Sequence, residues 1–334
     1  MSEYHIPVLL AESVSALVTN PSGTYADATF GGGGHTAAIL SRLHGDGRVI
    51  AIDRDIEAIQ NAPADPRLTL IHNNFRFIEN YAEQLSRQSL RSAERIAERR
   101  GIIGGSAPSS EPDGGEHAVF DGILADLGVS SHQFDTAGRG FSFRFEDAPL
   151  DMRMNQEAKR TAADVVNEAS EADLERILRL YGEVDGARAM ARLIVVARSE
   201  APLETTGDLD RAIARLLPRN AEHKVLAKVY QALRIEVNQE MRSLEKFLDG
   251  AARCLKPGGR LVVITYHSLE DRMVKNFIKT GNVEGNLQTD VYGRVYTPLE
   301  AVGRKPVLPS EEEIAGNTRA RSAKLRVAER RIAE

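Results

Sequence analysis

Four consecutive glycines stand among residues suited to binding a charged cofactor. The run Gly31–Gly34 follows Asp27 closely and is followed at once by His35. Glycines let the backbone approach a ligand, and the start of the next helix offers unpaired N–H groups. Asp53 comes 22 residues after Gly31, near the ~20-residue spacing at which a carboxylate reaches ribose hydroxyls. The pattern predicts a site for a cofactor that contains a nucleoside.

Other kinds of loop fit the glycine run less well. A P-loop would need a Gly-Lys-Ser/Thr sequence, which is missing, and the dinucleotide fingerprint of a dehydrogenase is matched only loosely, by Gly32, Gly34 and Ala37. A plain tight turn with a capping acid leaves the agreement of glycines, strand order and acid unexplained. Asp27, placed where a carboxylate could meet an ammonium group, and a later Pro-Gly-Gly turn resemble features of S-adenosylmethionine-dependent methyltransferases.

The elements that must position these residues alternate between strand and helix. Five apolar segments are predicted strands of a mostly parallel sheet, because helical segments lie between them at both ends of the chain. We therefore expect an α/β fold, a Rossmann-like class I methyltransferase domain with an inserted all-helical subdomain. The predicted strands are Thr24–Phe30, Gly47–Asp53, Arg67–His72, Phe120–Leu127 and Arg260–Tyr266, the last after the Pro257–Gly259 turn.

Between the fourth and fifth strands the apolar residues follow helical spacing. We expect residues 134–223 to form the helical insertion and residues 1–133 and 224–334 to form the cofactor-binding domain. Ser170 and Thr206 are predicted helix N-caps. One long helix is expected from His223 to Leu255, and the charged, Gly- and Ser-rich segment Ser86–Ala118 is expected to be a flexible loop.

Composition limits the partners and the compartment. The 43 basic residues against 48 acidic ones give a net charge of −5, so nucleic acid must be bound locally and not by a uniformly basic surface. The single cysteine, Cys254, excludes an intramolecular disulfide and indicates a cytoplasmic protein. No apolar segment approaches the ~18 residues of a membrane span. The eight histidines are scattered, so no metal site is expected.

Ten motifs spread over nearly the whole chain resemble one family, that of ribosomal RNA small subunit methyltransferase H. They are HIPVLL, TFGGGGH, AIDRD, DLGVSSHQFD, RGFSF, PLDMRM, YGE, QALRIEVN, HSLEDR and RARSAKLRVAER. The resemblance implies that S-adenosyl-L-methionine donates a methyl group to the exocyclic N4 of a cytidine in the decoding region of 16S ribosomal RNA. Two departures are Gly32, where many relatives carry a longer residue, and the length of the Ser86–Ala118 segment.

The same resemblance implies which residues hold the cofactor. Gly33, Gly34 and His35 would surround its methionine end, and Asp53 would bind its ribose. Phe75 would pack on the adenine, although an ordinary core phenylalanine is an equal alternative. Asp126 and Gln133 would complete the pocket.

Asp126 is also the candidate catalytic residue. A carboxylate that accepts a hydrogen bond from the cytosine amine would localise its lone pair and stabilise the developing positive charge. The alternative, that Asp126 only binds the cofactor, stays open. Many amino methyltransferases carry an aromatic residue at this strand end, whereas this chain has Leu-Gly-Val, and Phe141 or Phe143 could replace it or simply anchor a core.

Substrate contacts are expected from a wider set of residues. The candidates are Ser130, Ser131, Arg139, Phe141, Phe143, Arg144, Arg153 and His267, with the C-terminal residues Arg319, Arg321, Lys324, Arg326, Arg330 and Arg331 as further phosphate ligands. The expected partner is small-subunit ribosomal RNA within the assembled subunit, and a homodimer stays open. Two alternatives are a methyltransferase for another acceptor and a non-catalytic ribosome-assembly factor.

Overall fold

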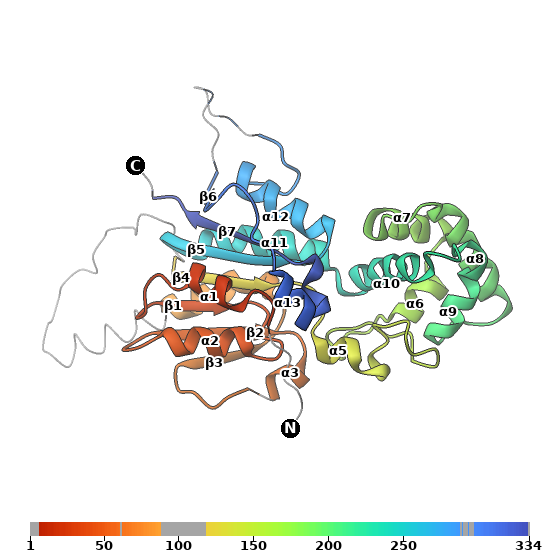
Figure 1. Ribbon diagram of the computed structural model, residues 1–334, viewed down its shortest axis with the longest axis horizontal. Helices are drawn as coiled ribbons and strands as arrows, with labels where there is room; N and C mark the ends of the chain where they lie inside the picture. The colour runs from red at the N-terminus through yellow and green to blue at the C-terminus, as the bar shows by residue number, and fades with distance from the viewer. Residues whose placement is uncertain are drawn as a thin grey trace, which may run out of the picture. The chain divides into compact units, whose positions relative to one another are not determined.

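A seven-stranded sheet in the order β3-β2-β1-β4-β5-β7-β6 forms the centre of the cofactor-binding part of the chain (Figure 1). The first five strands run parallel, β7 pairs antiparallel with β5, and β6 pairs antiparallel with β7. This confirms the predicted α/β class and all five predicted strands. The bounds are β1 Thr24–Asp27, β2 Arg48–Asp53, β3 Leu68–His72, β4 Phe120–Asp126, β5 Leu255–Thr265, β6 Leu299–Ala301 and β7 Lys324–Arg330.

The computed structural model describes residues 7–60, 62–87, 118–287, 289, 293 and 297–332. The chain divides into a first unit, Met1–Gly128 with Arg242–Glu334, and a second unit, Val129–Met241. The second unit is therefore longer than the insertion expected over residues 134–223. Most of the loop expected over Ser86–Ala118 lies outside the described residues. No helix in the described part of the chain is long and apolar enough to cross a bilayer.

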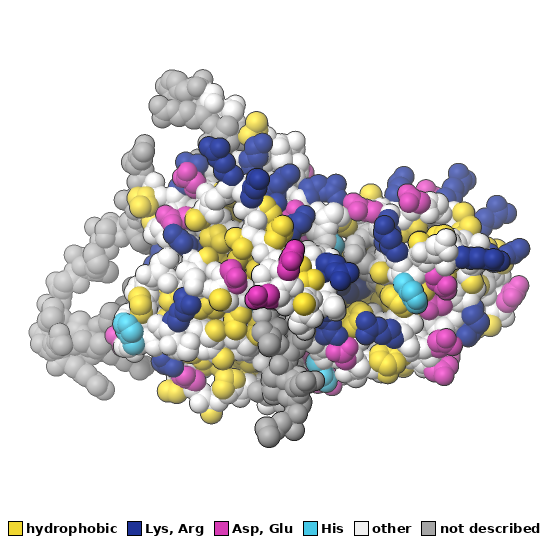
Figure 2. All heavy atoms as spheres, in the orientation of Figure 1, with side chains coloured by type: hydrophobic (Ala, Val, Ile, Leu, Met, Phe, Trp, Pro, Cys, Tyr) yellow, Lys and Arg dark blue, Asp and Glu magenta, His cyan; other side chains and the backbone are white. Residues whose placement is uncertain are grey.

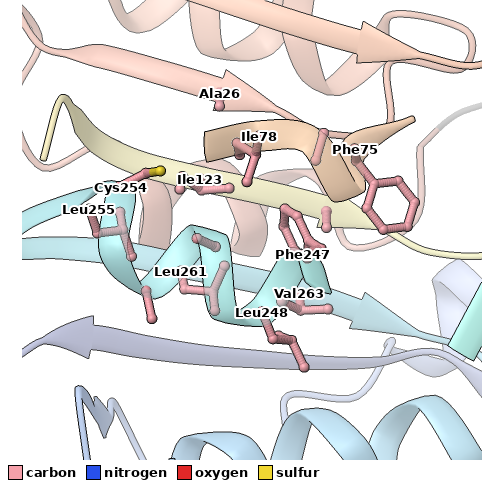
Figure 3. Close-up of a cluster of buried hydrophobic side chains, with 14 of the residues drawn as sticks. Ala26, Phe75, Ile78, Ile123, Phe247, Leu248, Cys254, Leu255, Leu261 and Val263 are labelled. Carbon is pink, nitrogen blue, oxygen red and sulfur yellow. The ribbon is translucent and has the colours of Figure 1, made fainter. Parts of the chain in front are cut away.

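Alternation along the strands of the first unit gives the sheet two apolar faces. Tyr25 and Leu124 point to one face, which packs on α1 and α2, whereas Ala26 and Ile123 point to the other. On that second face lie Phe247 and its neighbours in α11, as Figure 3 shows. The helices of this unit are α1 Leu10–Leu17, α2 Gly34–Arg42, α3 Ile56–Gln60, η1 Phe75–Phe77, residues 78–87, α11 Glu240–Cys254, α12 Ser268–Thr280, α13 Glu311–Gly316 and η4 Thr318–Ser322.

The predicted Pro-Gly-Gly turn is an irregularity at the start of β5. Phe120 pairs with Leu255, but the next pair joins Gly122 to Arg260, so several residues of β5 bulge out of register. Gly258 has a φ of 77°, which glycine adopts without strain. The strand therefore starts five residues earlier than expected and regains its register at Arg260.

The second unit is helical and has its own core. Its elements are α5 Ser131–Asp135, η2 Ala137–Arg139, α6 Ala162–Glu168, α7 Glu171–Gly182, α8 Ala187–Glu200, α9 Thr206–Ile213, η3 Ala214–Leu216 and α10 Glu222–Asn238. Leu174, Ile177 and Leu178, spaced as one helical face, are fully buried in this core. The helical character expected from apolar spacing is thus present.

Of the two predicted helix N-caps, one is correct. Ser170 caps α7 as expected, because its side chain accepts a hydrogen bond from the Asp173 N–H. The cap of α9 is Thr205, so the prediction of Thr206 is wrong by one residue. Thr205 forms a capping box with Asp208, whereas the hydroxyl of Thr206 donates a hydrogen bond to the carbonyl of Phe145.

The long helix expected from His223 to Leu255 is broken at Gln239. This residue adopts a left-handed conformation (φ 49°), which ends α10 and lets α11 begin at Glu240. Arg234 spans the break with hydrogen bonds of 2.9 and 3.0 Å to the two carboxylate oxygens of Glu240. Asn238 donates to the Met152 carbonyl at 2.7 Å. No glycine or proline marks the break, which is why apolar spacing alone missed it.

Candidate cofactor and methyl-transfer site

The glycine loop is fixed to the carboxyl ends of β1 and β2 through Asp53. One oxygen of this carboxylate accepts the Gly31 N–H at 2.7 Å, and the other accepts the Asp55 N–H at 2.8 Å. The Phe30 N–H donates to the Ile52 carbonyl at 2.9 Å. Burial raises the pKa of Asp53, while the hydrogen bonds from Asp55 and Gly31 oppose this shift. Ligands of parallel sheets bind at this edge.

Glycine is required at two positions of this loop and dispensable at a third. A Cβ atom at Gly34 would lie 2.2 Å from Cγ of Pro7, and one at Gly33, whose φ is 75°, would lie 2.8 Å from the Phe30 ring. A Cβ atom at Gly32 would meet nothing within 4 Å. An added Cβ atom at position 32 therefore fits this loop without rearrangement.

Asp27 does not face a ligand, contrary to the expectation that it meets an ammonium group. Its side chain is fully buried. One carboxylate oxygen accepts the Thr36 hydroxyl at 2.6 Å and the other accepts the Thr29 N–H at 3.1 Å. Asp27 therefore ties β1 to the start of α2, and it supports the site from inside the domain.

Asp126 lies at the end of β4 and joins segments that are distant in the sequence. One carboxylate oxygen accepts the Tyr266 hydroxyl at 2.8 Å, and the other lies 3.7 Å from Nδ1 of His35. The Asp126 N–H donates to the Thr29 hydroxyl oxygen at 2.6 Å. Its side chain keeps 22% of its surface exposed. Burial raises the pKa of Asp126 to about 6, against the lowering effects of His35 and Tyr266.

His35 offers an unused polar atom beside the glycine loop. The residue is 5% exposed, and its Nε2 atom is buried with no hydrogen-bond partner in the part of the chain that the structure describes. A buried polar atom without a protein partner is costly, so a water molecule or a ligand is expected to contact it. The first turn of α2, which begins at Gly34, adds backbone N–H groups at the same place. These donors fit a carboxylate such as that of a methionine group.

Phe75 is mostly a core residue. It is 7% exposed, and its ring packs edge-on against Phe247 with centroids 5.2 Å apart. The Arg54 guanidinium lies 5.7 Å from the ring centroid. Figure 3 shows Phe75 at the end of the buried cluster, toward the tips of the strand arrows. Its place after β3 is close to Asp53, whose carbonyl accepts the Asn73 N–H at 2.8 Å.

Gln133, Ser130 and Ser131 belong to the second unit. Ser130 caps α5, accepting the Gln133 N–H at 3.2 Å, while Oε1 of Gln133 accepts the Ser130 N–H at 3.2 Å. Ser131 is the first residue of the helix. Gln133 is 4% exposed. The side chain expected at the cofactor thus also stabilises the start of α5.

Most of the expected RNA-binding side chains of the second unit serve its own fold. Arg139 is 4% exposed and donates hydrogen bonds of 3.1 Å to the carbonyls of Arg153 and Met154. Arg153 pairs with both oxygens of Asp151 at 2.9 and 2.6 Å. Both guanidiniums therefore organise the 139–158 loop, and neither is presented as a simple phosphate ligand.

The two candidate phenylalanines are also packed. Phe141 is 5% exposed within the core of the second unit. Phe143 stacks on His223 at 5.7 Å and meets Tyr230 edge-on at 5.5 Å. These contacts agree with the core-anchor alternative.

In the first unit, His267, Lys324 and Arg326 are likewise engaged. His267 caps α12, and its Nε2 atom lies 3.1 Å from Glu270. Lys324 and Arg326 pair with Asp271 at 3.2 and 2.7 Å, which ties β7 to α12. The cationic segment near the C-terminus was expected to meet phosphates, but part of it forms β7, which lies between β5 and β6 in the sheet.

Sequence reasoning gave no role to Tyr266, Thr29 or Glu270. Glu270 is 2% exposed and accepts the Tyr266 N–H at 2.9 Å. The available signal was strand order, because residues that end adjacent parallel strands meet at one edge of a sheet. Asp126 pairs with Ile264 across β4 and β5, which brings Tyr266 next to Asp126.

A glycine loop after β1, an acid at the end of β2 and the strand order of this sheet together define an S-adenosyl-L-methionine-dependent methyltransferase. The chain belongs to the MraW methylase family, whose model matches residues 2–331. It is 51% identical over 328 residues to Ribosomal RNA small subunit methyltransferase H of Bacteroides fragilis (strain YCH46), covering 98% of each chain. The relative of the same name from Flavobacterium johnsoniae is 48% identical and covers 98% of this chain and 98% of its own length. The relative of that name from Cytophaga hutchinsonii is 45% identical and covers 98% of this chain and 99% of its own length.

Proposed function

We propose that this enzyme transfers a methyl group from S-adenosyl-L-methionine to the exocyclic N4 of a cytidine in the decoding region of 16S ribosomal RNA. The observation that carries this proposal is the 51% identity, over 98% of both chains, to a relative named as a small subunit ribosomal RNA methyltransferase. An ionisable acid at the catalytic edge of the sheet, Asp126, suits an amine as the acceptor.

The cofactor site is built from the first unit. Gly33, Gly34 and His35 bind the methionine end, because backbone donors and the unpartnered Nε2 atom of His35 lie together there. Asp53 accepts hydrogen bonds from the ribose, and Phe75 packs on the adenine. The bound cofactor supplies an activated methyl group on a sulfonium, so the protein's task is alignment.

Asp126 supplies the chemistry that the acceptor needs. The lone pair of a cytosine amine is delocalised into the ring, and an ionised carboxylate that accepts one of its N–H groups localises that pair. The carboxylate then stabilises the positive charge that develops on nitrogen as the methyl group is transferred. Because the pKa of Asp126 is raised only to about 6, the side chain is ionised at neutral pH.

Binding to RNA phosphates requires exposed cationic side chains that are not already paired with carboxylates of the protein. Lys275 and Lys279 on α12 are exposed, as are Arg188 and Arg192 on α8. None of the four forms an ion pair with a carboxylate among the residues that the structure describes. Figure 2 shows Lys and Arg side chains gathered over α12 in the first unit and over α8 in the second. We assign the phosphate contacts to these two faces, and substrate recognition to the helical unit.

The remaining partners follow from the substrate. The assembled small subunit is the form of RNA on which the enzyme acts, which places its work in the cytoplasm. A homodimer is compatible with these roles, and nothing in the mechanism requires it.

Methyl incorporation tests the proposed function. Labelled S-adenosyl-L-methionine is incubated with small ribosomal subunits from a strain that lacks this modification, and the product nucleosides are separated. Wild type is expected to label cytidine N4. Asp53→Ala is expected to weaken cofactor affinity on the order of 10- to 100-fold, since charge-assisted hydrogen bonds are lost. Asp46→Ala, which removes an exposed acid of the β1–β2 connection, is the matched control. Tight cofactor binding without any label in RNA would contradict the proposal that the methyl acceptor is a cytidine of 16S ribosomal RNA.

A further inference from the structure

Tyr266 is held at three points beside the candidate catalytic acid. Its hydroxyl donates to Asp126 at 2.8 Å, and its backbone N–H donates to Glu270 at 2.9 Å. Its ring covers Gly128, where an added Cβ atom would lie 3.4 Å away and where φ is 102°. Glu270 is itself buried and caps α12 in a box with His267. A phenol fixed in this way has little freedom to turn from the carboxylate.

We propose that Tyr266 is a positioning residue for methyl transfer, whose hydroxyl occupies one oxygen of Asp126 and orients the other toward the acceptor amine. This inference rests on the function proposed above. Asp126 has two further contacts. Its backbone N–H donates to the Thr29 hydroxyl oxygen at 2.6 Å, and its second carboxylate oxygen lies 3.7 Å from Nδ1 of His35. Preorganised acceptors of this kind avoid reorganisation during the reaction. Tyr266 is well suited, because a phenol donates a hydrogen bond without adding a charge.

The charges around Asp126 and Tyr266 also shift the pKa values of both side chains. Asp126 faces His35 of α2, Asp27 of β1 and Glu270 of α12. Burial and the two acids raise its pKa, whereas His35 and the Tyr266 hydroxyl lower it. Tyr266 faces Asp126, Glu270 and Glu313, and burial together with these acids raises its pKa, so it remains a neutral donor. Removing the hydroxyl therefore raises the pKa of Asp126 and leaves less of the ionised form at neutral pH.

The test is the pH dependence of turnover in Tyr266→Phe. With small subunits and cofactor saturating, kcat of the wild type is expected to fall on the acid side near pH 6. In Tyr266→Phe that limb is expected to move up by about one pH unit, because a hydrogen bond to the charged form is lost. At pH 7 this shift alone is expected to lower kcat about twofold, because the ionised fraction of Asp126 falls from roughly nine-tenths to one half. Tyr25→Phe is the matched control, since it removes a phenol that donates to the Asn20 carbonyl at 2.8 Å in the same unit.

Three outcomes decide between the explanations. If the acid side of the kcat–pH profile lies at the same pH in Tyr266→Phe, Tyr25→Phe and wild type, the positioning role is overturned. Wild type that labels no RNA at any pH defeats the proposed function instead. If Tyr266→Phe does not fold, difluorotyrosine incorporated at position 266 keeps the ring and strengthens the donor, and the limb is expected to move to lower pH; an unmoved limb again overturns the inference.

Discussion

Each unit of the molecule contains a tyrosine that donates a hydrogen bond to an aspartate, and Tyr266 is half-buried whereas Tyr230 is buried. In the first unit Tyr266 donates to Asp126 at 2.8 Å, and in the second Tyr230 donates to Asp210 at 3.1 Å. Burial raises the pKa of both aspartates to about 6. By electrostatics alone the two pairs are equivalent candidates for an active site.

Their neighbours separate them. Asp126 ends a strand at the ligand-binding edge of a parallel sheet and shares its surroundings with the unpartnered imidazole atom of His35. Asp210 sits within α9, and Tyr230 also approaches the Thr206 carbonyl at 3.4 Å, which closes the network inside a helical core. A shifted pKa therefore reports burial, and the adjacent unused donors identify the site.

Replacing the two aspartates by asparagine gives the largest expected difference. Asp126→Asn keeps the shape of the side chain but removes the charge, so kcat is expected to fall by about 100-fold or more. Asp210→Asn is expected to leave kcat within about twofold. The measurement is single-turnover methyl transfer at pH 7.5 with both variants at matched stability. Equal losses of kcat in Asp126→Asn and Asp210→Asn would show that the two tyrosine–aspartate pairs do not differ in their role in catalysis.

The pH dependence sharpens the same comparison. Asp126 accepts a hydrogen bond from the amine only when ionised, so wild-type turnover is expected to fall as pH drops through about 6. The sign for stability is opposite, because a carboxyl whose folded-state pKa is raised binds its proton more tightly in the folded state. Acidification from pH 7 to 5 thus stabilises the fold through this group. An acid limb that followed the loss of folded protein would contradict this assignment.

A second comparison lies within the glycine loop. Gly34→Ala places a methyl group 2.2 Å from the Pro7 ring, whereas the same group at Gly32 meets nothing within 4 Å. Gly34→Ala is expected to destabilise the first unit by about 1–3 kcal/mol and to weaken cofactor binding, since overpacking shifts the backbone. Gly32→Ala should match wild type. Thermal unfolding with and without S-adenosylhomocysteine measures both effects, and a loss of binding in Gly32→Ala would show that the loop is tighter than its geometry indicates.

Local sequence patterns were sufficient for much of this architecture. The five parallel strands follow from short apolar segments bounded by glycine and charged residues, and the helices of the second unit follow from apolar spacing. The strand β7 was missed because Lys324–Arg330 resembles an exposed cationic segment. Lys324 and Arg326 both pair with Asp271, more than 50 residues earlier in the chain. Pairing of this kind depends on tertiary contact, which periodicity does not contain.

The residues of the candidate site also differ in whether a local sequence pattern or only tertiary contact reveals them. Asp53 was predicted from its distance to the glycines, and its hydrogen bond to Gly31 shows why that distance matters. Asp27 was expected to meet an ammonium group of the cofactor, but it is fully buried and accepts the Thr36 hydroxyl. The meeting of His35, Asp126 and Tyr266 joins three segments that no local pattern connects. Strand order supplies that connection, and strand order was only partly predicted.

Charge reversal on two helices tests which unit recognises RNA and has the smallest expected effect. Lys275→Glu with Lys279→Glu alters α12 of the first unit, and Arg188→Glu with Arg192→Glu alters α8 of the second. Each phosphate that a variant no longer neutralises should reduce the slope of log affinity against log salt by about 0.7–0.9. We expect each double variant to reduce that slope by about 1.5 and to leave cofactor affinity unchanged, with Arg42→Glu on α2 as the control for charge alone. If only the α12 variant altered the slope of log affinity against log salt, phosphates would be bound at α12 alone. Substrate recognition would then be assigned to the cofactor-binding unit and not to the helical unit.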